Sequence, residues 1–169
     1  MRVAIYIILA LVALQRLIEV VYAERNTRAL LARGAVEIGR AHYPLIVSLH
    51  AAWLITIVLV LPRGATIHWI PLAIFILLQA ARVWVIATLG PYWTTRIITL
   101  DAAPLVRKGQ YRFVRHPNYL VVAGEIAALP LAFGELNVAI VFTLLNAAVL
   151  AWRIREEDAA LRTRRIGAG

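Results

Sequence analysis

Three mainly apolar runs, each close to twenty residues long, constrain this chain more than any other feature. They cover residues 3–22, 44–61 and 69–89. A helix needs about 20 apolar residues to cross the hydrocarbon core of a bilayer, since each residue adds about 1.5 Å. The chain is 62% hydrophobic, whereas soluble domains are about 45–50% apolar. We therefore predict a membrane protein whose residues 1–169 form a single transmembrane domain.

A fourth apolar stretch, residues 119–152, is too long for one crossing. Pro130, Gly134 and Glu135 interrupt it, because proline and glycine disfavour a continuing helix. We predict a helical hairpin with a short arm at 119–133 and an ordinary arm at 135–152. The expected fold is all-α, with about five transmembrane helices and a short, charged C-terminal helix on the cytoplasmic side.

The charge pattern orients these predicted helices. The chain has 18 Lys and Arg against 9 Asp and Glu, a net charge of +9. Most cations lie in three polar segments, residues 25–40, 96–115 and 153–165. The positive-inside rule places all three in the cytoplasm and the N-terminus outside. The Ala- and Arg-rich composition points to a bacterial source, so we expect the inner membrane.

The same composition argues against two classes of function. The basic residues are spread over separate membrane-proximal loops and form no single basic face, so we expect no nucleic-acid partner. The chain has no Cys, and its four His residues lack a tight ligand spacing, so we expect no metal site.

A polar cluster precedes the predicted hairpin, where Arg115, His116, Pro117 and Tyr119 follow Gly109. Glycine permits positive-φ geometry, and proline favours the first turn of a helix. We predict a helix that begins near Pro117, with its N-terminus placed to bind an anionic group. The alternative is an interfacial anchor, in which Arg snorkels and Tyr lies at headgroup depth.

A second polar cluster follows the last apolar run and contains Arg153, Glu156, Glu157 and Asp158. Arg153 and Glu157 are four residues apart and share one helix face. The alternative here is a solvated helix with a routine ion pair. Because topology places both clusters in the cytoplasm, we predict that they form one site.

The two clusters together resemble the motifs of the isoprenylcysteine carboxyl methyltransferase family. That family has the pattern G-x-Y-x-x-x-R-H-P-x-Y, then a helical hairpin, then R-I-x-x-E-E-x-x-L. The resemblance covers the C-terminal half, from about Leu89 onward. It implies that S-adenosylmethionine is the methyl donor and that the site faces the cytoplasm. The cofactor-binding residues that it implies here are Lys108, Gly109, Tyr111, Arg115, His116, Pro117, Tyr119, Leu120 and Glu157. The implied catalytic residues are Arg153, Glu157 and His116.

Two departures from the family pattern concern the C-terminus. Asp158 stands where the family often has a second Glu, and the chain ends soon after Leu161 without an aromatic-rich tail. The resemblance implies an O-methylated product from a lipophilic acceptor that enters from the bilayer. The acceptor is either a prenylcysteine-like carboxylate or, in a bacterium, the hydroxyl of an alkylpyrone or alkylresorcinol.

Charged residues also lie inside the apolar runs, and they leave two interpretations open. Arg16 and Glu19 are three apart in the first run, and Arg82 and Glu125 lie in later ones. The first interpretation is an ion pair between helices. The second is that Glu19, Arg82 or Glu125 faces the substrate cavity, because ionisable residues in a membrane are expensive and often functional.

Two further functions compete with methyl transfer. A small cation transporter could use Glu19 as an intramembrane binding carboxylate, although Arg16 nearby would repel a cation. A non-catalytic membrane scaffold predicts no defined cofactor pocket. Neither alternative explains why the two polar clusters occur together.

Overall fold

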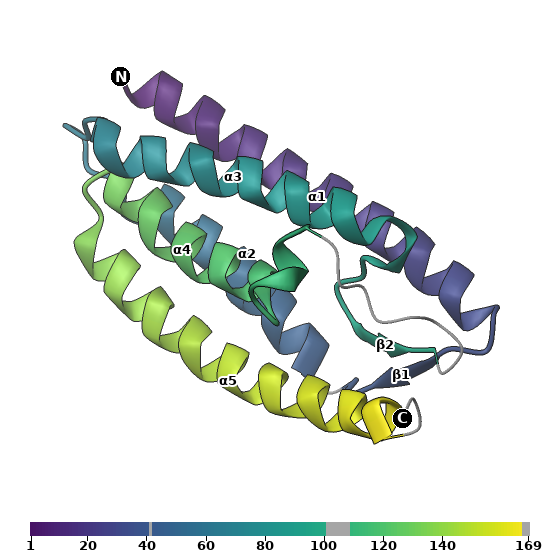
Figure 1. Cartoon of the computed structure of the whole chain (residues 1–169). Coiled ribbons are helices and arrows are strands. Elements are labelled where there is room, and N and C mark those ends of the chain that lie inside the picture. The colour runs from purple at the N-terminus through teal and green to yellow at the C-terminus, as the bar shows by residue number, and fades with distance from the viewer. Residues whose placement is uncertain (41, 101–108, 167–169) are drawn as a thin grey trace.

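The computed structural model describes residues 1–40, 42–100 and 109–166, and it is mainly helical (Figure 1). The five α-helices are α1 (Arg2–Leu31), α2 (His42–Val60), α3 (Trp69–Leu89), α4 (Pro117–Ala132) and α5 (Leu136–Ile166). Two 3₁₀ turns are η1 (Gly90–Tyr92) and η2 (Gly109–Arg112). The prediction of an all-α membrane protein is confirmed.

Four of the described helices, α1, α2, α3 and α5, are long and apolar enough to cross a membrane. The remaining helix, α4, has 16 residues, which corresponds to about 24 Å of helix. It forms the short arm of the predicted hairpin with α5. Gly134 makes the turn between the two arms with a φ of 81°, a conformation that favours glycine.

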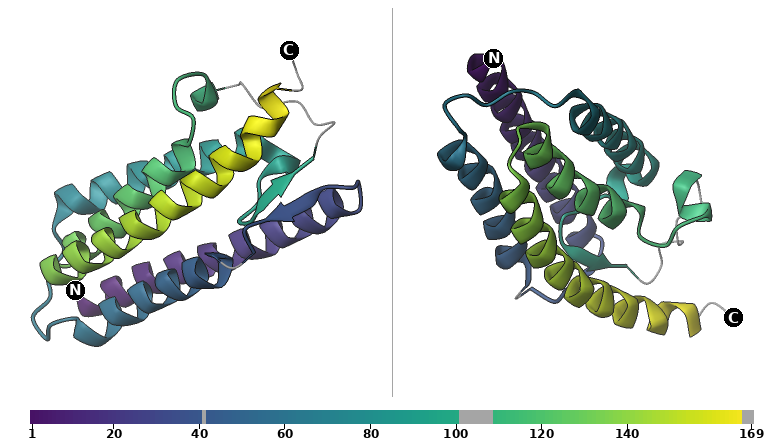
Figure 2. Two further views of the ribbon diagram at one scale, coloured as in Figure 1. Left: turned by 90° about the horizontal axis from the view of Figure 1, so that it is seen from below. Right: turned by 90° about the vertical axis from the view of Figure 1, so that its left-hand side faces the viewer.

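The helices form a bundle in which α4 lies between α3 and α5 (Figures 1 and 2). α2 packs on α5, and α1 lies along α2. The core joins apolar side chains of all five helices, among them Ile5 of α1, Trp53 of α2, Phe75 of α3, Leu129 of α4 and Phe142 of α5.

The outer surface of the bundle is also apolar. Large side chains such as Leu11, Leu59, Ile70, Leu77 and Leu144 are between 60% and 77% exposed. Exposed apolar area on this scale marks a surface that contacts lipid or another apolar partner. Together with the length of the helices, it identifies an integral membrane protein.

A small antiparallel sheet forms at the polar end of the bundle, where β1 (Val36–Ile38) pairs with β2 (Ile97–Thr99). Glu37 lies opposite Ile98 in the register. The sheet ties the segment after α1 to the segment after α3, and α5 contacts both strands. Three-residue strands are too short to show the alternation by which strands are recognised, so the sequence did not predict them.

Two helices extend beyond their predicted bounds. The charged C-terminal segment was expected as a separate short helix, but α5 runs through it without a break. Between residues 152 and 166 there is no glycine or proline to end the helix. For the same reason α1 continues nine residues past the expected end at Tyr22, to Leu31.

Candidate functional site

The loop before α4 has the local geometry that its sequence predicts. Gly109 begins η2 with a φ of 52°. A Cβ at this glycine would lie 3.3 Å from Thr88 Oγ1 of α3, so the loop lies close against that helix. Pro117 is the first residue of α4 and His116 is its N-cap. The predicted start of the helix is therefore confirmed.

The Tyr119 hydroxyl joins the two motifs, and it is the centre of the candidate site. It donates a hydrogen bond to Glu157 of α5 and accepts one from Arg153 Nε at 2.7 Å. The buried Arg153 guanidinium also lies over the Tyr119 ring, 5.5 Å from its centroid. A further Arg153 nitrogen donates to the Thr95 carbonyl at 2.8 Å. The pair predicted on one face of α5 is thus linked through a tyrosine of α4.

His116 completes this group from the N-cap of α4. Its ring stacks on Tyr119 with centroids 5.2 Å apart. His116 Nδ1 lies 3.8 Å from Glu157 Oε2, and Nε2 lies 3.4 Å from Asp158 Oδ1. Asp158, which departs from the family pattern, therefore contacts the site directly. We call Arg153, Glu157, Asp158, His116 and Tyr119 the end cluster.

Three buried polar atoms at residues 116, 118 and 158 form no hydrogen bond. They are His116 Nε2 and Asp158 Oδ1, which face each other at 3.4 Å, and Asn118 Oδ1 in the first turn of α4. Buried polar atoms usually have partners, so each unpaired atom needs an explanation, such as a ligand. The Asn118 side chain was not among the predicted site residues, although the helix N-terminus at residues 117–118 was expected to bind an anionic group.

The other predicted cofactor residues are less closely grouped. Tyr111 is half-buried in η2, and burial together with the negative charge of Glu157 raises the pKa of its hydroxyl, which therefore stays protonated. Arg115 is exposed and Leu120 is 63% exposed, so neither packs within the end cluster. Lys108 lies outside the described residues.

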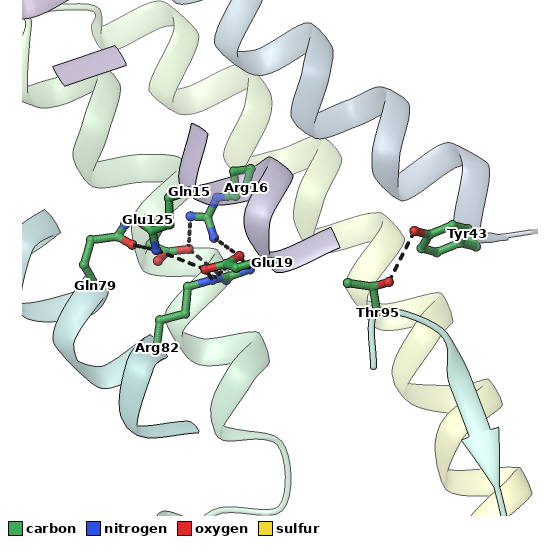
Figure 3. Close-up of polar contacts among 8 residues, drawn as sticks. All are labelled: Gln15, Arg16, Glu19, Tyr43, Gln79, Arg82, Thr95 and Glu125. Carbon is green, nitrogen blue, oxygen red and sulfur yellow. Dashed lines mark hydrogen bonds and ion pairs between the residues drawn. The ribbon is translucent and has the colours of Figure 1, made fainter. Parts of the chain in front are cut away.

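A second polar cluster lies among the helices and is drawn in Figure 3. Arg82 of α3 pairs with Glu19 of α1 at 2.6 Å and with Glu125 of α4 at 3.2 Å. Arg16 bridges the same two acids, at 3.0 Å to Glu19 and 2.8 Å to Glu125. Gln15 donates to Glu19 at 3.0 Å and to Gln79 at 2.7 Å. We call these six residues the interior cluster.

The interior cluster agrees with the ion-pair interpretation of the charges within the helices. Glu19, Arg82 and Glu125 are buried and contact one another directly or through Arg16. Gln15 and Gln79 were not predicted from the sequence. Each lies one helical turn before a charged member of the cluster, and that spacing within an apolar run was the available signal.

This pairing weakens the transporter alternative. Both oxygens of Glu19 accept hydrogen bonds from Arg82, and Arg16 and Gln15 contact one oxygen each. A carboxylate neutralised by two guanidinium groups attracts a cation weakly. Among the side chains that the structure describes, no group of three or more His, Asp and Glu could hold a metal ion.

Comparison with known proteins agrees with the two motifs. The model of the isoprenylcysteine carboxyl methyltransferase family matches residues 69–163. The uncharacterized protein YpbQ of Bacillus subtilis (strain 168) is 35% identical over 161 residues, which is 93% of this chain and 96% of that protein. An uncharacterized protein of Haemophilus influenzae is 29% identical over 142 residues, 81% of this chain and 83% of its own length. No solved structure matches this chain. The chain therefore belongs to the isoprenylcysteine carboxyl methyltransferase family of integral membrane proteins.

Proposed function

We propose that this protein transfers a methyl group from S-adenosylmethionine to an oxygen of a lipophilic acceptor at the membrane. The observation that carries the proposal is the Tyr119 hydroxyl, which joins Arg153 and Glu157 of one family motif to the other motif. We further propose that the end cluster faces the cytoplasm of a bacterial cell, at the inner membrane. The positive-inside pattern of the three Arg-rich segments supports this orientation.

The residues of the end cluster fit the polar part of S-adenosylmethionine. Its ammonium and ribose hydroxyls need acceptors. Asn118 Oδ1 is a buried acceptor without a hydrogen bond, and Asp158 Oδ1 lies 3.4 Å from His116 Nε2 but accepts no hydrogen bond. Glu157 and Asp158 also place negative charge where a cationic sulfonium would be stabilised. The exposed Arg115 and the N-terminus of α4 suit the carboxylate of the cofactor. When bound, the cofactor supplies an electrophilic methyl group.

Methyl transfer is an in-line displacement, so the main task of the protein is to align the acceptor oxygen with the methyl group of the donor. Arg153 holds Tyr119 and the Thr95 carbonyl in fixed positions, and the stacked His116 ring closes one side of the cluster. A carboxylate acceptor is already ionised and needs only orientation. A hydroxyl acceptor must lose its proton, and Glu157 or His116 would accept it.

Isothermal titration of the purified protein with S-adenosylhomocysteine tests the proposal directly. We expect saturable binding, with an affinity about tenfold lower in Glu157→Gln because a charged acceptor is lost. Glu24→Gln serves as the matched control, since Glu24 is a partly exposed acid of α1 whose ion pairs are with Arg28 and Arg96. The absence both of binding and of methyl transfer to any bacterial lipid extract would refute the proposal.

A further inference from the structure

The connection between η2 and α4 carries the most exposed large apolar side chain among the described residues. Phe113 is 84% exposed, and Val114 beside it is 36% exposed. Both lie outside the helices, so the lipid-facing surface of a membrane span does not by itself account for them. Single exposed apolar residues are common on protein surfaces. The position of this connection on the bundle therefore decides what Phe113 contacts.

The packing of η2 fixes its depth along the bundle. A Cβ on Gly109 would lie 3.3 Å from Thr88 Oγ1 and 3.5 Å from Trp84 Nε1, both of α3. The Thr88 hydroxyl also donates to Gln110 Oε1 at 3.3 Å. Because Trp84 and Thr88 lie in the last two turns of α3, η2 is within about 8 Å of the end of that helix. This places η2 beside the end of a membrane span, at the depth of the headgroups and upper acyl chains.

The side of the bundle that carries η2 is apolar. Trp84 of α3 is 55% exposed, and Leu120 in the first turn of α4 is 63% exposed. Tryptophan at the end of a span is typical of the membrane interface. Both views in Figure 2 show the η2 turn standing out from the bundle rather than folding back over it. An apolar tip in this position meets lipid.

We propose that residues Arg112, Phe113 and Val114, which we call the η2 tip, insert into the adjacent leaflet and bind an anionic phospholipid. Phe113 and Val114 enter the upper acyl region. Arg112 stays at headgroup depth, where its planar guanidinium donates to the phosphate oxygens. Under the proposed orientation this is the cytoplasmic leaflet, in which anionic lipids attract basic segments. This binding is independent of methyl transfer and adds a lipid partner to the proposed function.

Arg112 is the cation available for that headgroup. It is exposed, and its guanidinium lies 6.0 Å from the centroid of the Phe113 ring, so the charge accompanies the apolar side chain. No acidic side chain of the described residues forms an ion pair with Arg112. Arg96, by contrast, pairs with Glu24 and Glu37. A zwitterionic headgroup carries its own cation, so Arg112 favours an anionic one.

A spin label tests the insertion, because the chain has no cysteine of its own. A nitroxide on Val114→Cys is measured in nanodiscs that contain phosphatidylglycerol. We expect it to be more accessible to oxygen, which concentrates in lipid, than to a neutral nickel chelate, which stays in water. Gly64→Cys, in the exposed loop between α2 and α3, is the control and should show the reverse. A label at residue 114 that favours the nickel chelate would overturn the insertion.

The same label tests the preference for an anionic headgroup. We expect its ratio of oxygen to nickel accessibility to be severalfold higher with phosphatidylglycerol than with phosphatidylcholine alone, and Arg112→Gln to abolish that difference. Arg33→Gln is the matched control and should retain it. Arg33 is also exposed, and its guanidinium lies 5.9 Å from the centroid of the Tyr92 ring, so the control removes the same charge and the same kind of ring contact. Equal ratios in the two lipids, or equal losses in the two variants, would overturn the headgroup assignment.

Discussion

The Tyr119 hydroxyl takes part in two charge-assisted hydrogen bonds at once, accepting from Arg153 and donating to Glu157. Such bonds are stronger than those between neutral groups. One hydroxyl therefore sets the spacing between the start of α4 and the polar end of α5. Arg153 is buried. If it lost the Tyr119 hydroxyl, water could not readily replace that acceptor, and its guanidinium would be left with an unsatisfied donor.

Replacing Tyr119 by Phe removes this hydroxyl and keeps the ring that stacks on His116. We expect S-adenosylhomocysteine affinity to fall about tenfold, because Glu157 loses its fixed position and Arg153 its acceptor. Titration calorimetry on the purified variant gives the measurement. Tyr6→Phe is the control, since the Tyr6 hydroxyl accepts a hydrogen bond from Arg2 in the first turns of α1. Unchanged binding in Tyr119→Phe would show that the hydroxyl does not shape the donor site.

At the scale of the elements, the sequence predicted those features that depend on local chemistry. The length of the apolar runs predicted the membrane-spanning helices, and Pro117 predicted the start of α4. The sequence could not show that Tyr119 would stand between Arg153 and Glu157, because that depends on how α4 and α5 are rotated against each other. It also missed the β1–β2 pair and the unbroken course of α5, which follow from contacts and from the absence of helix-breaking residues.

The η2 turn gives an element-scale prediction through Gly109. Gly109→Ala introduces a Cβ 3.3 Å from Thr88 Oγ1 at a φ of 52°, a conformation that costs an L-residue about 1–2 kcal/mol. We expect the turn to detach from α3, so that limited trypsin digestion cleaves faster after Arg112 and Arg115. Gly64→Ala is the control, because nothing lies within 4 Å of a Cβ there. Equal cleavage rates in the two variants would contradict a close packing of η2.

At the scale of the whole molecule, the bundle holds two separate polar clusters. The end cluster joins the start of α4 to the C-terminal part of α5 and, through the Thr95 carbonyl, to the segment before β2. The interior cluster lies deeper, among helices whose outer faces are apolar. Under the proposed function, a water-soluble donor would reach the end cluster from the solvent, and a lipid-soluble acceptor would enter from the bilayer. This arrangement requires that the polar end face the compartment in which the donor is made.

The orientation can be tested with single cysteines, since the chain has none of its own. Ala32→Cys lies just after α1 at the polar end, and Gly64→Cys lies in the exposed loop between α2 and α3. Because cations favour the cytoplasmic side, we expect a membrane-impermeant maleimide to label Gly64→Cys in right-side-out vesicles and Ala32→Cys only in inverted ones. Both should react in detergent, which controls for accessibility. The opposite labelling pattern would place the end cluster outside the cell, where S-adenosylmethionine from the cytoplasm could not reach it.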